Sequence, residues 1–282
     1  VSLVTGANVG LGLQTSLQLA RQGSKVVMTC RSEAKCNAAV DTIRAEVPGA
    51  DLVPMTLDLM SLQSVADFVA QYKATGLPLH TLVANAGRMI CPFELSADGI
   101  ESQFAINHVG HFGLVLGLLD IVKASTPSRI VVVSSDAHKY VGLPDDLDHI
   151  SKEELYGTVA AYGVSKTANI LFARKLASLL EGEDVYVNAA HPGFVNTDLG
   201  RHVGTVYGDL ITSPFKAIQN ALAFTVEDGA LTQLYLATSP EVVEDNIRGQ
   251  YYRPIAVQVE PAAHATDDAV ADKLWEWSLG II

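Results

Sequence analysis

Tyr162 and Lys166 stand four positions apart and are the pair in this chain best suited to proton chemistry. On an α-helix, residues at this spacing share one face, so the ammonium of Lys166 can lie near the phenol and favour its ionised form. A tyrosine whose pKa is lowered in this way donates or accepts a proton near neutral pH. The same spacing is common on solvent-exposed helices, so the pair predicts catalysis only together with other motifs.

Hydride transfer to a carbonyl creates an alkoxide, so a site for this reaction needs an acid beside the oxygen and a donor that orients it. Tyr162 can supply the proton, and Ser135, at the end of a predicted strand, can hydrogen-bond the same oxygen. Lys166 can stabilise the tyrosinate and reach the ribose hydroxyls of a cofactor. The three side chains therefore predict a carbonyl reductase or alcohol dehydrogenase site.

A glycine motif, Thr5-Gly6-x-x-x-Gly10-x-Gly12, lies near the start of the chain. It joins a predicted strand to a predicted helix, and its glycines allow a tight turn and a close approach of the backbone to a pyrophosphate. Asn8 and Leu11 lie in the same turn and belong to the predicted cofactor contacts. Because glycines also serve ordinary strand-to-helix turns, such a turn is the competing interpretation.

The segment Thr29-Cys30-Arg31-Ser32 ends the second predicted strand. An enzyme that uses NAD usually carries an acid here to hold the ribose 2′-hydroxyl, and this chain has none. The guanidinium of Arg31 suits a 2′-phosphate, so the segment predicts NADP(H) rather than NAD(H). A solvated arginine at the start of a helix is the alternative.

Two further strand ends contribute predicted cofactor contacts. Asp58, followed by Leu59, can accept a hydrogen bond from an adenine amino group or can cap the helix that contains Ser61. Both interpretations of Asp58 stay open. The segment Asn85-Ala86-Gly87 follows the fourth strand and lets the backbone run beside a cofactor, with a plain turn as the alternative.

Short β-branched runs alternate with longer amphipathic stretches, a pattern typical of β-α-β crossovers. The predicted fold is a single-domain, doubly wound Rossmann fold over 1–282, with a seven-stranded parallel sheet and helices on both faces. Two intervals without clean periodicity, 136–157 and 194–224, follow strands at the carboxyl edge and are the expected substrate loops. The predicted strands are Val1–Thr5, Lys25–Thr29, Leu52–Thr56, Thr81–Ala84, Arg129–Ser134, Val185–His191 and Gln250–Tyr252.

Charge and cysteine content exclude several classes of partner. The net charge of -12 opposes sequence-independent binding to nucleic acid or anionic lipid and favours a small-molecule partner. Cys30, Cys36 and Cys91 form no C-x-x-C pair and no histidine-interleaved pattern, so neither a disulfide framework nor a zinc site is expected. A reducing compartment, cytoplasm or plastid, fits this expectation.

The histidines and the apolar runs receive structural interpretations. His108 and His111 have no evident acidic partner or third ligand, so helix packing is expected instead of metal binding. The longest apolar run, around Phe112 to Leu119, is too short to span a bilayer and is expected to form a buried helix. Val1–Thr5 already resembles a buried strand, so no signal peptide is expected.

Taken together, these motifs resemble the short-chain dehydrogenase/reductase family over essentially the whole chain. The resemblance implies that Asn107 holds a water that links Lys166 to solvent, and that Ser135, not the adjacent Ser134, is the catalytic serine. The residues that match the family's signature are Gly6, Gly10, Gly12, Asn85, Ala86, Gly87, Asn107, Ser135, Tyr162 and Lys166. The segment that the resemblance places beside the nicotinamide contains Pro192, Gly193, Val195 and Thr197.

Finer resemblance points to the branch of the family that contains retinol dehydrogenases and the WW-domain oxidoreductase. The branch acts on lipophilic alcohols and carbonyls, although the amino-terminal anchor of typical retinol dehydrogenases is not seen, which does not favour a membrane-embedded retinoid. The matching segments are 107–112, 134–138, 162–172, 191–193 and 274–278. The aromatics expected either to line an apolar pocket or to belong to the core are Phe194, Tyr207, Phe215 and Phe224.

The resemblance implies an NADP(H)-dependent alcohol dehydrogenase or carbonyl reductase. It also implies a homodimer or homotetramer formed through helices over Asn107–Lys123 and Tyr162–Leu180. One alternative is a catalytically silent sensor or scaffold that binds NADP(H). Another is an enzyme similar to protochlorophyllide reductase, which shares the motif Asn107–Phe112. No motif specifies the substrate.

Overall fold

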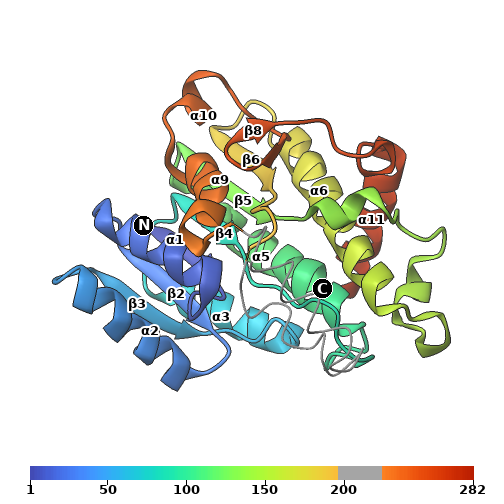
Figure 1. Ribbon diagram of the computed structural model, residues 1–282, viewed down its shortest axis with the longest axis horizontal. Helices are drawn as coiled ribbons and strands as arrows, with labels where there is room; N and C mark the ends of the chain where they lie inside the picture. Colours follow the sequence, from blue (N-terminus) through green and yellow to red (C-terminus); the bar gives the residue numbers. More distant parts are fainter. Residues whose placement is uncertain (196–223) are drawn as a thin grey trace.

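A single sheet forms the centre of the fold (Figure 1). The computed structural model describes residues 1–195 and 224–282, and in them eight strands have the order β3-β2-β1-β4-β5-β6-β7-β8. The strand order reverses between β1 and β4, and in doubly wound folds ligands bind in the crevice at this reversal. The strands are β1 (Ser2–Thr5), β2 (Val26–Cys30), β3 (Leu52–Thr56), β4 (Thr81–Ala84), β5 (Ser128–Val133), β6 (Val185–Ala190), β7 (Tyr251–Arg253) and β8 (Val257–Gln258).

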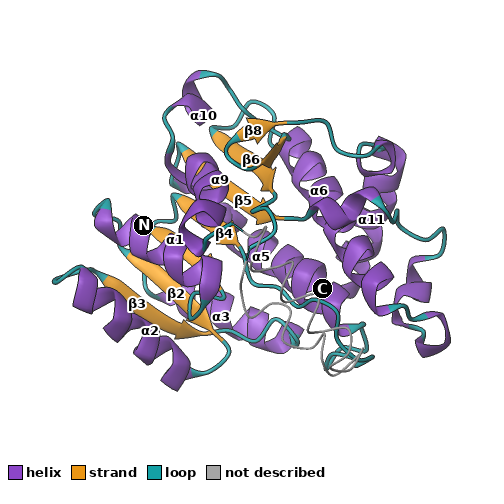
Figure 2. Ribbon diagram, viewed as in Figure 1, coloured by secondary structure: helices purple, strands orange, loops and turns teal. Residues whose placement is uncertain are grey.

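Helices fill the intervals between the strands and cover both faces of the sheet (Figure 2). The longer helices are α1 (Gly10–Arg21), α2 (Glu33–Glu46), α3 (Leu62–Ala74), α5 (Gly110–Ala124), α6 (Thr158–Leu179), α9 (Val226–Thr238) and α11 (Asp268–Ile281). The short helical segments are α4 (Ser102–Phe104), η1 (Ala105–Val109), η2 (Asp136–Lys139), η3 (Leu147–Ser151), η4 (Glu153–Leu155), α10 (Glu241–Glu244) and η6 (Ala263–Ala265).

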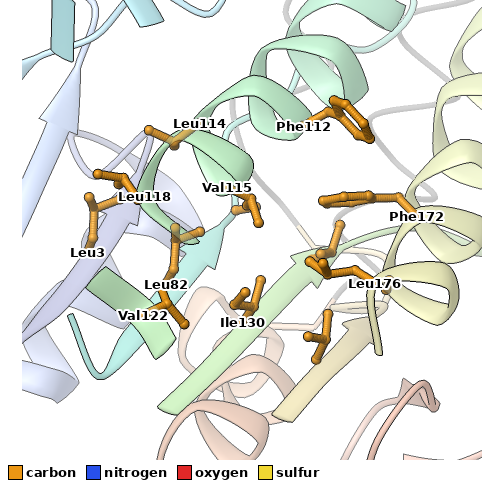
Figure 3. Close-up of a cluster of buried hydrophobic side chains, with 14 of the residues drawn as sticks. Leu3, Leu82, Phe112, Leu114, Val115, Leu118, Val122, Ile130, Phe172 and Leu176 are labelled. Atoms are coloured by element: carbon orange, nitrogen blue, oxygen red, sulfur yellow. The ribbon is translucent and has the colours of Figure 1, made fainter. Parts of the chain in front are cut away.

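The core consists of two apolar layers, one on each face of the sheet. Side chains of α1, α2 and α9 form the first layer, and those of α3, α5 and α6 form the second. In the second layer, Phe112 of α5 and Phe172 of α6 have their ring centroids 5.3 Å apart, above Leu82 and Ile130 of the sheet (Figure 3). Burial of each such side chain contributes about 1.5–3 kcal/mol, so this layer fixes α5 and α6 firmly on the sheet.

The C-terminal helix α11 forms an outer layer against α6 (Figure 1). Trp275 of α11 stacks on Phe172 with ring centroids 6.1 Å apart, and Lys175 of α6 pairs with Asp272. The helix that the family resemblance assigns to a subunit contact is therefore covered on this side by the chain itself. The oligomeric state stays a prediction.

All seven predicted strands are present, and each end is shifted by no more than one residue. The expected number of strands was wrong, because β8 adds an eighth strand that runs antiparallel to β7. This strand has only two residues, Val257 and Gln258, and both are exposed. A strand of two exposed residues has no alternation of apolar and polar side chains, so the sequence gives no signal for it.

One helical stretch, Ser102–Ala124, is long and apolar enough to cross a bilayer by length and composition. Its mean hydropathy over the best window is 1.5, but 61% of that window is buried inside the fold. The expected buried helix around Phe112 to Leu119 is thus present and longer than its apolar run. A core helix of a soluble fold gives the same composition, so this stretch is weak evidence for a membrane span.

The expectation that the cysteines stay unpaired was wrong, because Cys30 and Cys36 form a disulfide. Cys30 ends β2, and Cys36 lies on the buried face of α2, which returns toward the sheet and brings the two Cα atoms within 5.5 Å. Motif spacing alone does not show this proximity. Cysteine content therefore no longer supports a reducing compartment, and Cys91 is the buried free cysteine among the described residues.

Gly12 permits α1 to start against the turn after β1. A Cβ atom at this position would lie 2.2 Å from the carbonyl oxygen of Gly6 and 2.6 Å from Nδ2 of Asn85. The Gly6 contact is with the backbone and cannot be relieved by rotating a side chain, so the backbone itself would have to move. Gly12 is therefore required for packing, whatever else it binds.

We expect Gly12→Ala to lower the free energy of unfolding by about 1–3 kcal/mol, because overpacking at a rigid contact costs that much. Chemical denaturation followed by circular dichroism measures the change. Gly280→Ala is the matched control, since a Cβ there meets nothing within 4 Å. Equal stability of the two variants would contradict this view of the turn.

Candidate active site

Two cavities adjoin at Tyr162 along the carboxyl edge of β1, β2, β4 and β5. The first, of about 480 Å³, collects most of the predicted cofactor contacts. Gly193 and Val195 line the second cavity instead, and Thr197 lies outside the described residues. The predicted contacts that line the first cavity are Gly6, Asn8, Gly10, Leu11, Gly12, Arg31, Asp58, Leu59, Asn85, Ala86, Gly87, Tyr162, Lys166 and Pro192.

The glycine turn forms one wall of the first cavity. Gly6 and Gly10 have φ angles of 65° and 53°, in the left-handed region that favours glycine. Helix α1 begins here with Val9 as its N-cap, which offers no side-chain hydrogen bond, and the first turn of the helix has no acidic residue. Free N–H groups at a helix N-terminus without an acid form a favourable place for a phosphate.

The Thr5 hydroxyl joins the glycine turn to the segment after β4. It accepts hydrogen bonds from the backbone N–H groups of Asn85 and Ala86, each at 2.9 Å, and lies 2.8 Å from Nε2 of His111. Because Nδ1 of His111 faces the carbonyl oxygen of Asn107 at 3.2 Å, the proton must be on Nδ1, and Nε2 accepts the Thr5 hydroxyl. Burial lowers the pKa of His111 to about 4, which keeps this ring neutral.

Asn107 lies in the π-helical segment η1, between α4 and α5. Its Oδ1 accepts the backbone N–H of Arg88 at 2.8 Å, and its Nδ2 donates to Oγ of Ser165 at 2.9 Å. The wider turn lets the Asn107 carbonyl meet His111 while its side chain faces α6. Asn107 lines neither cavity, and the water-holding role implied by the resemblance stays a prediction.

Tyr162 and Lys166 lie on the buried face of α6, as their spacing predicts. Nζ of Lys166 lies 5.6 Å from the ring centroid of Tyr162 and donates a hydrogen bond of 2.9 Å to the carbonyl oxygen of Val133. Only 7% of Tyr162 and 4% of Lys166 is exposed, and both side chains line the first cavity. The helix thus presents a phenol and an amine side by side to any molecule bound there.

The expectation that Lys166 lowers the pKa of Tyr162 was wrong for this structure. Burial raises the pKa of Tyr162 to about 12, and the hydrogen bond with the Ser135 side chain offsets only part of that increase. Burial also lowers the pKa of Lys166 to about 7. Sequence spacing predicted the proximity of the two groups correctly but could not show how completely both are removed from water.

The two adjacent serines have different roles. Ser134 donates its hydroxyl to the backbone carbonyl of Lys166 at 2.7 Å, which fixes β5 to α6. Ser135 hydrogen-bonds Tyr162 and lines the second cavity, and Nδ1 of His138 donates to its backbone carbonyl at 2.7 Å. This arrangement supports Ser135 as the catalytic serine.

Arg31 lies at the far end of the first cavity, together with Ser32 and Lys35. Lys35 was not predicted, although its position one turn into the helix after Arg31 could have suggested it. Asp58 lines the cavity and accepts the backbone N–H of Met60 at 3.0 Å, while Ser61 is the N-cap of α3. The capping interpretation thus applies to Ser61, and Asp58 stays available to the cavity.

The second cavity, of about 580 Å³, adjoins Ser135 and Tyr162. Most of its lining is apolar and includes Phe194 and Phe224, whereas Tyr207 and Phe215 lie outside the described residues. Asp136, His191 and Arg253 also line it; sequence patterns gave no sign of a polar wall there. Most residues of this cavity come from the segments that follow β5 and β6 and from β7 and β8 with their flanks, and Leu11 and Met89 join them from the segments after β1 and β4.

His108, the other histidine considered for metal binding, is buried and lines neither cavity. Its Nε2 lies 2.9 Å from the hydroxyl of Ser278 in α11, and its ring packs at 5.1 Å from that of Phe104. Within the described residues, no group of three or more His, Cys, Asp or Glu side chains is placed to hold a metal ion. His108 therefore joins α11 to the core.

Comparison with known proteins gives consistent matches along the chain. A family model described as short chain dehydrogenase matches residues 1–144 and 150–207. Retinol dehydrogenase 14 of Homo sapiens is 41% identical over 98% of this chain and 84% of its own length. The chloroplastic short-chain dehydrogenase TIC 32 A of Brassica napus is 37% identical over 100% of this chain and 88% of its own.

A solved structure resembles the fold as a whole. The crystal structure of a putative uncharacterized protein from Mycobacterium paratuberculosis superposes with a TM-score of 0.76 at 30% identity, over 99% of this chain and 92% of that one. An actinorhodin polyketide ketoreductase structure with NADPH superposes with a TM-score of 0.70 at 24% identity, over 89% and 94%. At that identity the second match supports the fold alone.

We expect Lys166→Met to stabilise the protein, most strongly at pH 7 and below. The folded pKa of about 7 lies below the unfolded value of 10.5, so the unfolded chain binds more protons between these values and wild-type stability rises with pH across that range. Methionine removes the buried charge, and the Val133 carbonyl still accepts Nδ2 of Asn169 at 3.0 Å. Thermal unfolding at several pH values measures the difference.

Lys175→Met on the same helix is the control, because that amine forms a surface ion pair with Asp272. Its effect should not grow toward low pH. Two results would contradict the view that burying the charged amine destabilises the fold: a Lys166→Met variant that is less stable than wild type at pH 6, or one whose gain in stability does not shrink toward pH 10.

Proposed function

The chain belongs to the short-chain dehydrogenase family of oxidoreductases, and on that basis we propose that it interconverts an alcohol and a carbonyl compound with NADP(H) as cofactor. The single observation that carries the proposal is the position of Tyr162. Its phenol lies where the two cavities meet, with Ser135 bonded to it and Lys166 beside it. A proton donor at such a junction can act on a substrate in one cavity while a cofactor occupies the other.

The first cavity fits a dinucleotide. The uncapped start of α1 offers N–H groups to a pyrophosphate, and Gly12 leaves no space for a side chain between the turn and Asn85. Asp58 and the segment Asn85–Gly87 would hold the adenosine and ribose portions along the strand ends. When bound, the nicotinamide supplies or accepts the hydride.

The proposed preference for NADP(H) depends on Arg31 and Lys35. Both side chains are exposed at the end of the first cavity, next to Ser32. Within the described residues neither forms an ion pair, so their charges stay available to a bound phosphate. A 2′-phosphate binds a guanidinium and an ammonium well, whereas a 2′-hydroxyl would favour an acid.

Tyr162 acts as the proton donor in the reductive direction. Its raised pKa, about 12, keeps the phenol protonated at neutral pH, and an alkoxide that forms beside it is a stronger base than tyrosinate. Ser135 orients the substrate oxygen through its hydroxyl. The donated proton leaves a tyrosinate in a buried site, where a positive charge on Lys166 stabilises it.

The protonation of Lys166 responds to the proton transfer from Tyr162. With a pKa of about 7 the amine is neutral in part of the molecules at neutral pH, and a negative charge on Tyr162 favours its protonation. Asn107, held by Arg88, Ser165 and His111, would support the path by which this proton is replaced from solvent. The substrate class that best matches the mostly apolar second cavity is a lipophilic ketone or aldehyde.

We expect Tyr162→Phe to reduce turnover of a ketone with NADPH by about a hundredfold or more, the usual effect of losing a general acid. The NADPH dissociation constant should stay nearly unchanged, because the ring and the cavity are kept. Steady-state kinetics and fluorescence titration measure the two quantities. Tyr140→Phe is the control, since Tyr140 is 84% exposed. Undiminished turnover in Tyr162→Phe would exclude the mechanism.

We expect Arg31→Ala to weaken NADPH binding about tenfold or more and to change NADH binding little, because only NADPH carries the 2′-phosphate. Titration with both cofactors measures the ratio. Arg44→Ala removes an equal charge from the exposed side of α2 and serves as the control. An unchanged preference in Arg31→Ala would refute the assignment.

A further inference from the structure

The second cavity has a polar wall that the proposed hydride-transfer chemistry does not use. Asp136, His191 and Arg253 form this wall, immediately beyond Ser135. The rest of the lining is largely apolar and includes Leu11, Met89, Phe224, Pro254, Val257 and Val259. Charged groups placed in such a cavity usually meet a polar partner. The wall therefore indicates a polar group on the molecule that binds there.

Positive charge exceeds negative charge at this wall. Oδ2 of Asp136 lies 2.7 Å from Nη2 of Arg253 and 3.1 Å from Nζ of Lys139, while Oδ1 accepts the Tyr251 hydroxyl at 3.2 Å. Although burial raises the pKa of Asp136, the hydrogen bond from Lys139 and the nearby cations lower it overall, so this carboxylate is ionised. One negative charge thus faces two positive charges, and both of its oxygens are engaged.

Within residues 1–195 and 224–282, Arg253 has donors that no protein group uses. Its Nε is buried without a hydrogen-bond partner in the part of the chain that the structure describes, and its recorded polar contact is the ion pair with Asp136. A guanidinium carries five N–H donors and no acceptor. Arg253 lines the cavity, so its Nη donors that do not pair with Asp136 can bind only an acceptor there.

His191 adds a neutral donor to the same wall. The side chain is 9% exposed, its Nδ1 is buried without a partner among the described residues, and burial lowers its pKa to about 4. A buried N–H without a partner is rarer and more costly than a buried lone pair, so the proton belongs on Nε2. Nε2 is the ring nitrogen left to meet a bound molecule.

We infer that Arg253 and His191 bind a carboxylate carried by the substrate, so that the enzyme acts on carbonyl compounds that are also acids. The inference rests on the proposed function and names its substrate class. Among the described residues the wall offers donors, both oxygens of its Asp136 carboxylate are engaged, and Arg253 together with the adjoining Lys139 outweighs that one negative charge. A carboxylate satisfies all three conditions, whereas a hydroxyl or a neutral carbonyl leaves the charge unbalanced.

The net charge of -12 opposes the approach of an anion, but only at long range. At physiological salt, charges separated by more than about 8 Å are largely screened. The charge of Arg253, which lines the cavity, therefore acts on a group that has entered it. The apolar lining would hold the remainder of the acid.

The test compares straight-chain methyl ketones that end in a carboxylate with their methyl esters, using the intact protein and NADPH. We expect kcat/KM for the better acids to exceed that for their esters by about tenfold, which corresponds to one charge-assisted hydrogen bond. In Arg253→Met this ratio should fall to near one. In Arg253→Lys, which keeps a charge but loses the planar fork, it should be intermediate.

Lys139→Met is the matched control, because Lys139 pairs with the same carboxylate but does not line the cavity. Direct contact predicts that Lys139→Met keeps most of the acid preference. If the two Met variants lose it equally, long-range charge explains the preference and the assignment of Arg253 is overturned. Absence of any acid preference in the wild type also overturns it.

Thermal protection separates this inference from the proposed function. The methyl ketone acids should raise the unfolding temperature of the wild type, in the presence of NADPH, more than their esters do, and this difference should vanish in Arg253→Met. If no compound is reduced but this pattern is seen, the proposed function fails and the carboxylate site stands. If esters and acids are reduced equally and protect equally, the proposed function stands and the carboxylate site fails.

Discussion

The site depends on the hydrogen bonds that the hydroxyl of Thr5 forms. This hydroxyl holds the backbone after β4 through Asn85 and Ala86 and reaches the π-helical turn through His111. One short chain of hydrogen bonds thus fixes the glycine turn, the strand end beside the first cavity and the carbonyl of Asn107. Because these groups are buried, each lost partner would cost about 1–3 kcal/mol, which explains why the chain satisfies all of them.

Burial at Tyr162 and Lys166 favours the neutral forms of both groups, whereas the proposed proton transfer requires charged forms. It raises the pKa of Tyr162 and lowers that of Lys166, so in the folded protein both groups favour their neutral forms. Burying a neutral group costs less free energy than burying a charged one, but the proposed reaction requires charge to develop on Tyr162 and Lys166. A buried amine that binds a proton more tightly when a negative charge develops nearby gives stabilisation where the transition state of the proposed reaction requires it.

Sequence patterns predicted the parts of the molecule that follow from local chemistry. The β-branched runs located seven strands, and the glycine spacing together with Arg31 located the first cavity, because strand ends in a parallel sheet meet at one edge. The disulfide between Cys30 and Cys36 and the strand β8 were missed. Both depend on how a short neighbouring segment folds back, and neither leaves a periodic signal. The pKa of Tyr162 was misjudged because spacing shows proximity and not burial. Arg253 and Asp136 are 117 positions apart by their numbers, so no local pattern could have paired them.

In the proposed reaction, a carbonyl carbon bound beside Tyr162 receives a hydride from NADPH. The most direct test of this transfer uses NADPH deuterated on the reactive nicotinamide carbon, with a methyl ketone as substrate and mass spectrometry of the product. We expect an alcohol that carries the deuterium on its carbinol carbon. An unlabelled alcohol, or ketone that is recovered unchanged across a broad carbonyl panel, would contradict it.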